Sequence, residues 1–307
     1  MPVQAQKVCT DILCWTRKIK FGGGFCMNVR QNITNFIPKQ PFMVDLADSY
    51  YKHVWNKFGI SHFYLFQTEK GTDKISLSVP DGCIDLIFHY DNNRDYIGAD
   101  WYGTALHPHS MKCYEKSMHF GVRFIPGQMP VLADAKMPEL IDKIIPYEEV
   151  GREKHLPEMI AEAGDFKEQI ETFQKIYLKI WEKNDESLSL KKQLVEEVIR
   201  NYGNLTVQDL SQKTGYSSSY IDKIFRREIG ISPKQFMAMM RFQGTLMDLS
   251  DRYRNNSEAD YAELVDQFGY YDQAHMINEF KKYSRSTPGA YIKKLSSMDY
   301  SKRLIEL

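Results

Sequence analysis

Three histidines and a glutamate in the first half of the chain belong to the residue types that bind transition metals. His107-Pro108-His109 is followed by Glu115 and by His119, and imidazole and carboxylate groups together can bind iron or zinc. Because a His-Pro-His sequence in a loop more often binds no ion, we predict no metal site at these residues. The sequence indicates no cofactor either.

Other residues that often carry chemistry lack the spacing that the chemistry needs. Gly22-Gly23-Gly24 precedes no Lys-Ser or Lys-Thr pair and forms no GxGxxG pattern, so we interpret it as a loop rather than a phosphate cradle. The cysteines contain no Cys-x-x-Cys pair, which argues against a zinc cluster and a disulfide scaffold. They are Cys9, Cys14, Cys26, Cys83 and Cys113. We therefore expect a reduced protein that is not an enzyme.

Polar residues near the C-terminus have the chemistry to contact nucleic acid bases. Lys can donate to guanine, Asp can accept from cytosine, Gln or Asn can form two hydrogen bonds with adenine, and Ala or Ile can touch the thymine methyl group. Residues of these types occur in two segments. In each segment they lie on the face of an expected helix that points away from its apolar face. These residues are Ser219, Asp222, Lys223 and Arg226 in the first segment, and Gln273, Ala274, Ile277 and Asn278 in the second.

The two segments are copies of one pattern. Residues 225–236 align with residues 280–291, and Phe, two basic residues, a hydroxyl, Pro and a final aromatic residue recur in the same order. Upstream, Gly215-Tyr216 aligns with Gly269-Tyr270. Each copy reads as a helix, a tight turn and a second amphipathic helix, which is the helix-turn-helix unit.

Residues that start and stop helices lie at matching places in both copies. A hydroxyl or carboxylate can cap each helix, and a glycine supplies the positive φ that ends the first helix of each unit. The expected caps and stops are Thr206, Gly215 and Ser217 or Ser218 in the first copy, and Asp260, Gly269 and Asp272 in the second. Ser232-Pro233 and Thr287-Pro288 each begin a further helix, because Pro is well tolerated at the first helical position.

The helix from Ser232 to about Asp251 joins the two units. Its roughly 20 residues span about 30 Å, which is close to one turn of DNA. Two second helices held at that separation could enter successive major grooves on one face of a duplex.

Residues 188–295 resemble the DNA-binding domain of AraC-type (arabinose-regulator-like) transcription factors. The strongest match is Gly-Tyr-Tyr-Asp-Gln-Ala-His-Met-Ile-Asn-Glu-Phe-Lys-Lys over 269–282, followed by Ser286-Thr287-Pro288 and Tyr291. The resemblance implies a regulator that binds double-stranded DNA sequence-specifically, more commonly an activator, with RNA polymerase as a partner. The chain departs from the family at three positions. Arg285 stands where the family usually has Gly, Met276 where it often has Phe, and Val265 where it often has Ala.

The register of the family implies which residues read DNA. Base edges would be faced by Ser219, Asp222 and Lys223 in the first unit, and by Gln273, Ala274, Ile277 and Asn278 in the second. The DNA backbone would be nearer to Arg226, Arg227, His275 and Lys281. The alternative for any one of them is a solvated surface residue. We expect Lys281→Ala to weaken binding to all sequences and Asn278→Ala to change sequence preference.

The first part of the chain has short aromatic and β-branched runs between turn signals, which predict an antiparallel β region over about residues 40–130. Its Pro80 to Phe88 run and its Phe124-Ile125-Pro126-Gly127 sequence resemble the cupin-like sensor domains of some AraC-type regulators. The expected fold is therefore α+β with two domains: an antiparallel cupin-like β barrel with helices, and an all-α domain with tandem helix-turn-helix units.

The cupin-like resemblance implies a small-molecule effector in the β region, where an apolar pocket is the general expectation. The aromatic candidates are Tyr64, Trp101, Tyr102 and Phe124, and core packing is the alternative for each. The histidine segment is also similar to the metal motif of enzymatic cupins. However, five residues separate His109 from Glu115, which is more than that motif has.

A helix with one apolar face is expected between the two regions, at Phe166, Ile170, Phe173, Tyr177 and Ile180. This face either packs on the β region or joins two copies as a homodimer through residues 166–180. The polar run 183–187 is the expected linker. The predicted domains are the sensor at 1–136, a helical dimerisation or linker region at 137–186, and the DNA-binding domain at 187–307.

Composition restricts the class of protein further. The 40 Lys and Arg residues balance 40 Asp and Glu residues, which excludes a protein that holds nucleic acid by bulk charge. Residues 187–307 carry 18 basic and 15 acidic side chains, so the slight basic excess lies in the half with the repeated units. No membrane-length apolar run and no secretory signal is evident. We expect a cytoplasmic protein without a membrane partner.

Two other classes of function remain as alternatives. One is a cupin-type metal enzyme fused to a DNA-binding module, which metal analysis of the purified protein would distinguish. The other is a protein-interaction module whose helix pairs have lost DNA binding, for which Arg285 is the supporting residue. In the leading hypothesis, an effector changes how the helices, including residues 166–180, pack against the DNA-binding domain.

Overall fold

The computed structural model describes residues 36–68, 76–111, 116–183 and 189–307. Residues 32–307 belong to one compact unit. Several positions discussed above lie outside the described residues: Gly22-Gly23-Gly24, Cys9, Cys14, Cys26, Cys113, Glu115 and residues 184–187 of the expected linker.

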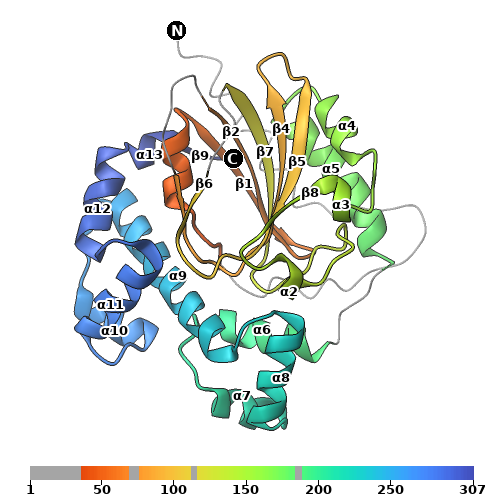
Figure 1. The fold of residues 1–307 in the computed structure, drawn as a ribbon. Helices are drawn as coiled ribbons and strands as arrows, with labels where there is room; N and C mark the ends of the chain where they lie inside the picture. The colour runs from red at the N-terminus through yellow and green to blue at the C-terminus, as the bar shows by residue number, and fades with distance from the viewer. Residues whose placement is uncertain (1–35, 69–75, 112–115, 184–188) are drawn as a thin grey trace, which may run out of the picture. The chain divides into compact units, whose positions relative to one another are not determined.

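The described strands form a seven-stranded main sheet and a two-stranded second sheet (Figure 1). The main sheet has the order β8-β5-β4-β7-β2-β1-β9, and its pairs are antiparallel except for the parallel pair of β1 and β9. The main sheet contains β1 (Tyr50–Lys57), β2 (Ile60–Gln67), β4 (Asp85–Asp91), β5 (Tyr96–Tyr102), β7 (Ser117–Phe124), β8 (Ile144–Pro146) and β9 (Leu304–Glu306). The second sheet pairs β3 (Ser76–Ser78) with β6 (His109–Met111).

The two faces of the main sheet have different chemistry because side chains alternate along each strand. On β4, Leu86 and Phe88 join the apolar core that includes the residues of α5 (Phe166–Trp181). The side chains that alternate with them, Asp85 and Ile87, line a cavity on the other side. This second face is where polar and charged groups are held inside the molecule.

The apolar face of helix α5 packs against the main sheet. Its Phe166, Phe173 and Tyr177 rings contact Phe120, Phe63 and Phe124 of the sheet at centroid separations of 5.8–6.0 Å. The Tyr177 hydroxyl also donates to the carbonyl oxygen of Phe58 at 2.8 Å. The apolar face therefore covers the chain's own sheet, which is the first of the two predicted alternatives.

Short elements connect and cover the sheet. The 3-10 helix η2 (Pro41–Leu46) precedes β1. In the described residues, three short α-helices precede α5 and one α-helix follows it at the start of the C-terminal region. They are α2 (Met137–Leu140), α3 (Tyr147–Val150), α4 (Leu156–Ala161) and α6 (Leu190–Arg200). We call the described residues 36–183 the sensor region and residues 189–307 the reader region.

The reader region is helical, as predicted, except at its C-terminal end. Its helices after α6 are α7 (Val207–Thr214), α8 (Ser218–Glu228), α9 (Pro233–Arg254), α10 (Tyr261–Phe268), α11 (Gln273–Ser284), α12 (Pro288–Ser297) and α13 (Tyr300–Arg303). The expected antiparallel β region with helices and the expected all-α region with two helix-turn-helix units are confirmed.

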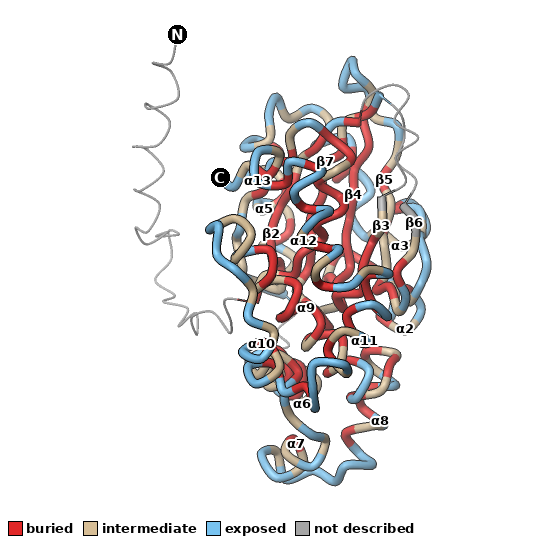
Figure 2. Tube along the Cα trace, turned by 90° about the vertical axis from the view of Figure 1, so that its left-hand side faces the viewer, coloured by how far each residue is buried: buried red, intermediate tan, exposed pale blue. Residues whose placement is uncertain are grey.

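Buried side chains connect the two regions. The buried apolar residues of the described chain form two clusters, and each cluster combines residues of the sheet with residues of the reader helices. Figure 2 shows the buried trace running through β4, β7 and α9, while the segments around α7 and α10 are largely exposed. The sensor and reader regions therefore share their cores through α9.

The end of the chain returns to the sensor sheet. Strand β9 pairs with β1 and forms one edge of the main sheet, with Leu304 opposite Tyr50 and Glu306 opposite Lys52. The amide of Leu307 donates to the carbonyl oxygen of Lys52 at 2.8 Å. The sequence did not predict this strand, because three residues without a neighbouring partner strand carry too little pattern to reveal it.

Candidate DNA interface and interior cavity

The first helix-turn-helix unit is built from α7 and α8, and its caps lie where the sequence placed them. Thr206 and Asp209 form a reciprocal capping box at the start of α7. Gly215 adopts φ +75° and ends that helix, and the Ser217 side chain caps α8. Local sequence alone dictates this turn, because each step is a contact between near neighbours in the chain.

Helix α8 has one buried face and one exposed face. Ile221, Ile224 and Phe225 are buried in the reader core. The predicted DNA contacts lie on the opposite side: Ser219, Lys223, Arg226 and Arg227 are exposed and Asp222 is half-buried. Arg226 donates to the Asp222 carboxylate at 2.7 Å. An exposed pair of this kind contributes little to stability, so Arg226 can exchange it for a phosphate.

The second unit, α10 and α11, repeats this arrangement. Asp260 and Asp272 cap the two helices, and Gly269 adopts φ +67° between them. Met276, Phe280 and Tyr283 face the core. Among the predicted DNA contacts, Gln273, Ala274, Asn278 and Lys281 are exposed, whereas His275 and Ile277 are half-buried.

Two of the predicted contacts on α11 also have structural partners. The Tyr271 amide donates to Nδ1 of His275 at 3.2 Å, and Nε2 of His275 lies 3.8 Å from the Glu279 carboxylate. Ile277 packs against the apolar core. These contacts hold the turn and the helix in place.

Arg241 of α9 is a positioning residue that sequence reasoning missed. Its guanidinium donates to both carboxylate oxygens of Glu279 on α11, at 2.8 and 2.7 Å, and it lies 5.0 Å from the Tyr270 ring centroid. Burial lowers the pKa of Arg241, but the hydrogen bonds and charge of Glu279 outweigh that effect and raise the pKa overall. The ion pair fixes the rotation of α11, the second helix of the second unit, on α9.

Exposed tyrosines flank both reading helices and were also missed. Tyr271 is 90% exposed and precedes the cap residue of α11. Tyr216 and Tyr220 stack at a centroid separation of 5.4 Å beside the start of α8, and both are exposed. In the sequence, the signal at these positions is a tyrosine next to the turn of each unit; their exposure is seen only in the structure.

A cavity of about 180 Å³ lies in the sensor region. Of the four predicted effector residues, Tyr64 and Tyr102 line it. Trp101 and Phe124 do not: they pack in the core on the other face of the sheet, where Trp101 stacks on Tyr147 at 6.0 Å. Trp101 and Tyr102 are adjacent on β5, so they must point to opposite faces.

Buried charges form one wall of the cavity. Arg123 donates to both oxygens of Asp85 at 2.9 and 2.6 Å and to Asp81 at 2.8 Å. The Tyr64 hydroxyl donates to Asp85 at 3.1 Å. Burial raises the pKa of Asp85, and the Arg123 guanidinium opposes that shift. The wall thus offers charged, hydrogen-bonding groups to a small polar molecule.

A glycine permits this arrangement. Gly121 lies on β7 between His119 and Arg123, and the Tyr64 ring occupies the space that a side chain at Gly121 would need. The ring can therefore lie across β7 and reach Asp85.

The histidines of this part of the chain lie in different surroundings. His109 lines the cavity, His107 is exposed, and the buried His119 lies 2.8 Å from His89 between their Nδ1 atoms. Within the described residues, no group of three or more His, Cys, Asp or Glu side chains is arranged to hold a metal ion.

Comparison with known proteins gives two family matches. A family described as a helix-turn-helix domain matches residues 210–294, and a family described as a domain of unknown function matches residues 58–146. In the described part of the chain, no helix has the length and apolar character to cross a membrane.

The curated relatives are named as regulators. The Msm operon regulatory protein of Streptococcus mutans is 27% identical over 38% of this chain and 40% of its own length. The transcriptional regulatory protein HptR of Staphylococcus aureus is 28% identical over 33% of this chain and 38% of its own length. The chain thus matches about two fifths of the length of these relatives.

Two solved structures are also similar. ToxT from Vibrio cholerae aligns at 10% identity and a TM-score of 0.44, covering 75% of this chain and 97% of ToxT. The C-terminal domain of the response regulator yesN from Fusobacterium nucleatum aligns at 27% identity and a TM-score of 0.30, covering 34% of this chain and 99% of that domain.

The two capped helix pairs define a double helix-turn-helix class of protein. Residues 210–294 of the reader region match the helix-turn-helix domain family.

Proposed function

We propose that this protein is a transcription regulator in which α8 and α11 each enter a major groove and read base edges. The observation that carries the proposal is the pairing of two correctly capped helix-turn-helix units on one helix, α9, which contacts both reading units. Each unit buries an apolar face and leaves a polar face exposed, which is the arrangement that groove binding needs.

The exposed residues divide into two roles. Lys223, Gln273 and Asn278 have the donors and acceptors to specify bases. Arg226, Arg227 and Lys281 have the charge to bind phosphates. Tyr271 has an exposed hydroxyl next to the start of α11, where it can add a further backbone contact.

A small molecule in the sensor cavity is the proposed regulatory signal. The turn at Gly82 adopts φ +74°, and an added Cβ there would meet Phe236 at 3.1 Å and Met240 at 3.2 Å, both on α9. The same loop supplies Asp81 and Cys83 to the cavity wall. Occupancy of the cavity can therefore bias the packing of α9.

Further partners follow from the regulator function. We propose RNA polymerase as the partner in activation, a cytoplasmic location, and the division into domains at residues 136 and 186. A homodimer through residues 166–180 would have to use the polar side of α5, since the apolar face covers the sheet.

A mobility-shift assay tests the DNA proposal. The probe is a duplex that the wild-type full chain selects from a random pool, titrated at several salt concentrations. We expect a salt-sensitive shift, a uniform affinity loss with a salt slope smaller by about one for Lys281→Ala, and an altered base preference for Asn278→Ala. Lys154→Ala, at an exposed lysine outside the reader region and outside α5, is the control. Absence of a salt-sensitive shift, or identical losses on every duplex for both variants, would overturn the proposal.

A further inference from the structure

Gln243 connects α9 to the sensor region through its side chain. It is fully buried. Its Oε1 accepts from the Lys39 amide at 3.0 Å, and its Nε2 donates to the Pro80 carbonyl oxygen at 3.0 Å and to the Lys39 carbonyl oxygen at 3.4 Å. One side chain of the reader region thus holds the backbone of two separate sensor segments.

Gln40 continues the connection into the cavity wall. Its Oε1 accepts from the Val79 amide at 2.9 Å, and its Nε2 donates to the Asp81 carboxylate at 2.8 Å. Asp81 also accepts from the Cys83 amide at 2.9 Å and binds Arg123 at 2.8 Å. The loop 79–83 is therefore held by Gln243 on one side and by the cavity charges on the other.

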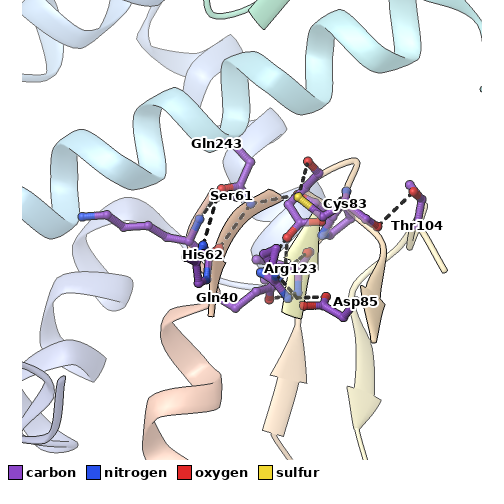
Figure 3. A network of polar contacts seen from close by, with 12 residues as sticks. Gln40, Ser61, His62, Cys83, Asp85, Thr104, Arg123 and Gln243 are labelled. Carbon is purple, nitrogen blue, oxygen red and sulfur yellow. Dashed lines mark hydrogen bonds and ion pairs between the residues drawn. The ribbon is translucent and has the colours of Figure 1, made fainter. Parts of the chain in front are cut away.

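Five residues form a path, which we call the relay: Gln243, Gln40, Asp81, Arg123 and Asp85. The last four are joined by side-chain bonds, and Gln243 joins them through the backbone of Lys39 and Pro80. Figure 3 shows Gln243 pointing from α9 toward the strands that carry Arg123 and Asp85. A second contact lies two turns further along α9, where Asp251 pairs with Lys39. All five members of the relay are at least nine-tenths buried.

We propose that the relay couples occupancy of the cavity to the position of α9, with Gln243 as the positioning residue at its reader end. The inference rests on the proposed function and adds the route of regulation. A ligand that hydrogen-bonds to Arg123 competes with Asp81 for the guanidinium, and a ligand that hydrogen-bonds to Asp85 competes with Arg123 for that carboxylate. The loop 79–83 then shifts, and because Gln243 is bonded to Pro80, α9 shifts with it.

The physical reason for a sharp response is the cost of a broken buried network. A buried donor or acceptor that loses its partner costs about 1–3 kcal/mol, so the relay rearranges as a unit. Packing through Gly82 alone would transmit a displacement of the loop to α9 without Gln243, whereas transmission through the relay requires Gln243.

A cavity-filling substitution tests the coupling without an identified ligand. Ala105 lines the cavity, so Ala105→Leu mimics occupancy. The dissociation constant for the selected duplex is measured for wild type, A105L, Q243M and A105L/Q243M. Gln193→Met, at an exposed position of α6, is the control for the loss of a glutamine. We expect A105L to change the affinity by about fivefold or more in the wild-type background and less than about twofold in the Q243M background. Equal effects in both backgrounds would overturn the relay.

Amide hydrogen exchange supplies a second measurement that needs neither DNA nor the Q243M variant. The amides of Lys39, Val79 and Cys83 donate to relay side chains. We expect A105L to change their exchange rates and to leave the Ile125 amide, which donates to Gly59, unchanged. If no duplex is bound but these three amides respond together, the DNA proposal fails and the relay stands. If they do not respond, the relay fails.

Discussion

Arg285 ends the second reading helix in a left-handed conformation and donates a hydrogen bond to the carbonyl oxygen of Pro108 at 2.5 Å. Its φ of +55° is a position that favours glycine. Pro108 precedes His109, which lines the cavity. The residue that departs from the family's glycine is therefore the one that joins the end of α11 to the edge of the cavity.

Two substitutions at Arg285 separate backbone strain from the hydrogen bond. Arg285→Gly removes both the strain and the bond, whereas Arg285→Ala removes the bond and keeps the strain. Since the left-handed conformation costs a residue with a Cβ about 1 kcal/mol relative to Gly, we expect R285A to be less stable than R285G by about that amount in urea unfolding of the full chain. An R285A variant as stable as R285G would contradict this account.

The ion pair of Arg241 and Glu279 should stabilise the reader region. Glu279→Ala leaves a mostly buried guanidinium beside Tyr270 without its carboxylate, so we expect a loss of about 2 kcal/mol in the free energy of unfolding. Asp222→Ala, which breaks the exposed pair with Arg226, is the matched control and should cost less than about 0.5 kcal/mol. Equal costs in denaturant titrations would show that burial does not distinguish the two pairs.

Gly121 should not tolerate a side chain. An added Cβ would overlap the Tyr64 ring, so Gly121→Ala must displace the tyrosine that hydrogen-bonds to Asp85. We expect a destabilisation of about 3 kcal/mol. Gly98→Ala on β5 is the control, because its added Cβ meets no described atom within 4 Å. The melting temperatures of both variants are measured by thermal unfolding. Similar melting temperatures would rule out a clash between the added Cβ and the Tyr64 ring.

Lys52 should give stability a pH dependence above pH 8. Burial lowers the pKa of Lys52 from 10.5 to about 8, against the opposing charge of Glu306. Between these values the unfolded chain holds a proton that the folded chain has released, so stability rises with pH across this window. Below pH 8 both states are protonated and the full cost of burial applies.

The measurement compares wild type with Lys52→Met by urea unfolding at pH 7 and pH 10. Relative to K52M, wild type should gain up to about 3 kcal/mol over this range. Glu306 keeps Arg254 as a partner at 2.7 Å in the variant. If the difference in free energy of unfolding between wild type and K52M is the same at pH 7 and pH 10, Lys52 does not titrate as described.

The local features of the reader region were readable from the sequence. Thr206, Gly215, Asp272 and Thr287 act on residues within a few positions of themselves, so caps and turns follow from short stretches of chain. The repeat then showed that the pattern occurs twice. The structure confirms each of these caps, and it extends the joining helix to Arg254.

The cavity and its connections were decided by tertiary structure. Strand alternation shows that Trp101 and Tyr102 face opposite sides, but only the packing of α5 determines which side is the core. The contacts of Gln243 with Pro80, of Arg285 with Pro108 and of β9 with β1 join residues more than 160 positions apart. The sequence by itself determined the two reading units, because their hydrogen bonds close within a turn of helix. The route from sensor to reader exists only after the chain has folded, because its partners meet through long-range packing.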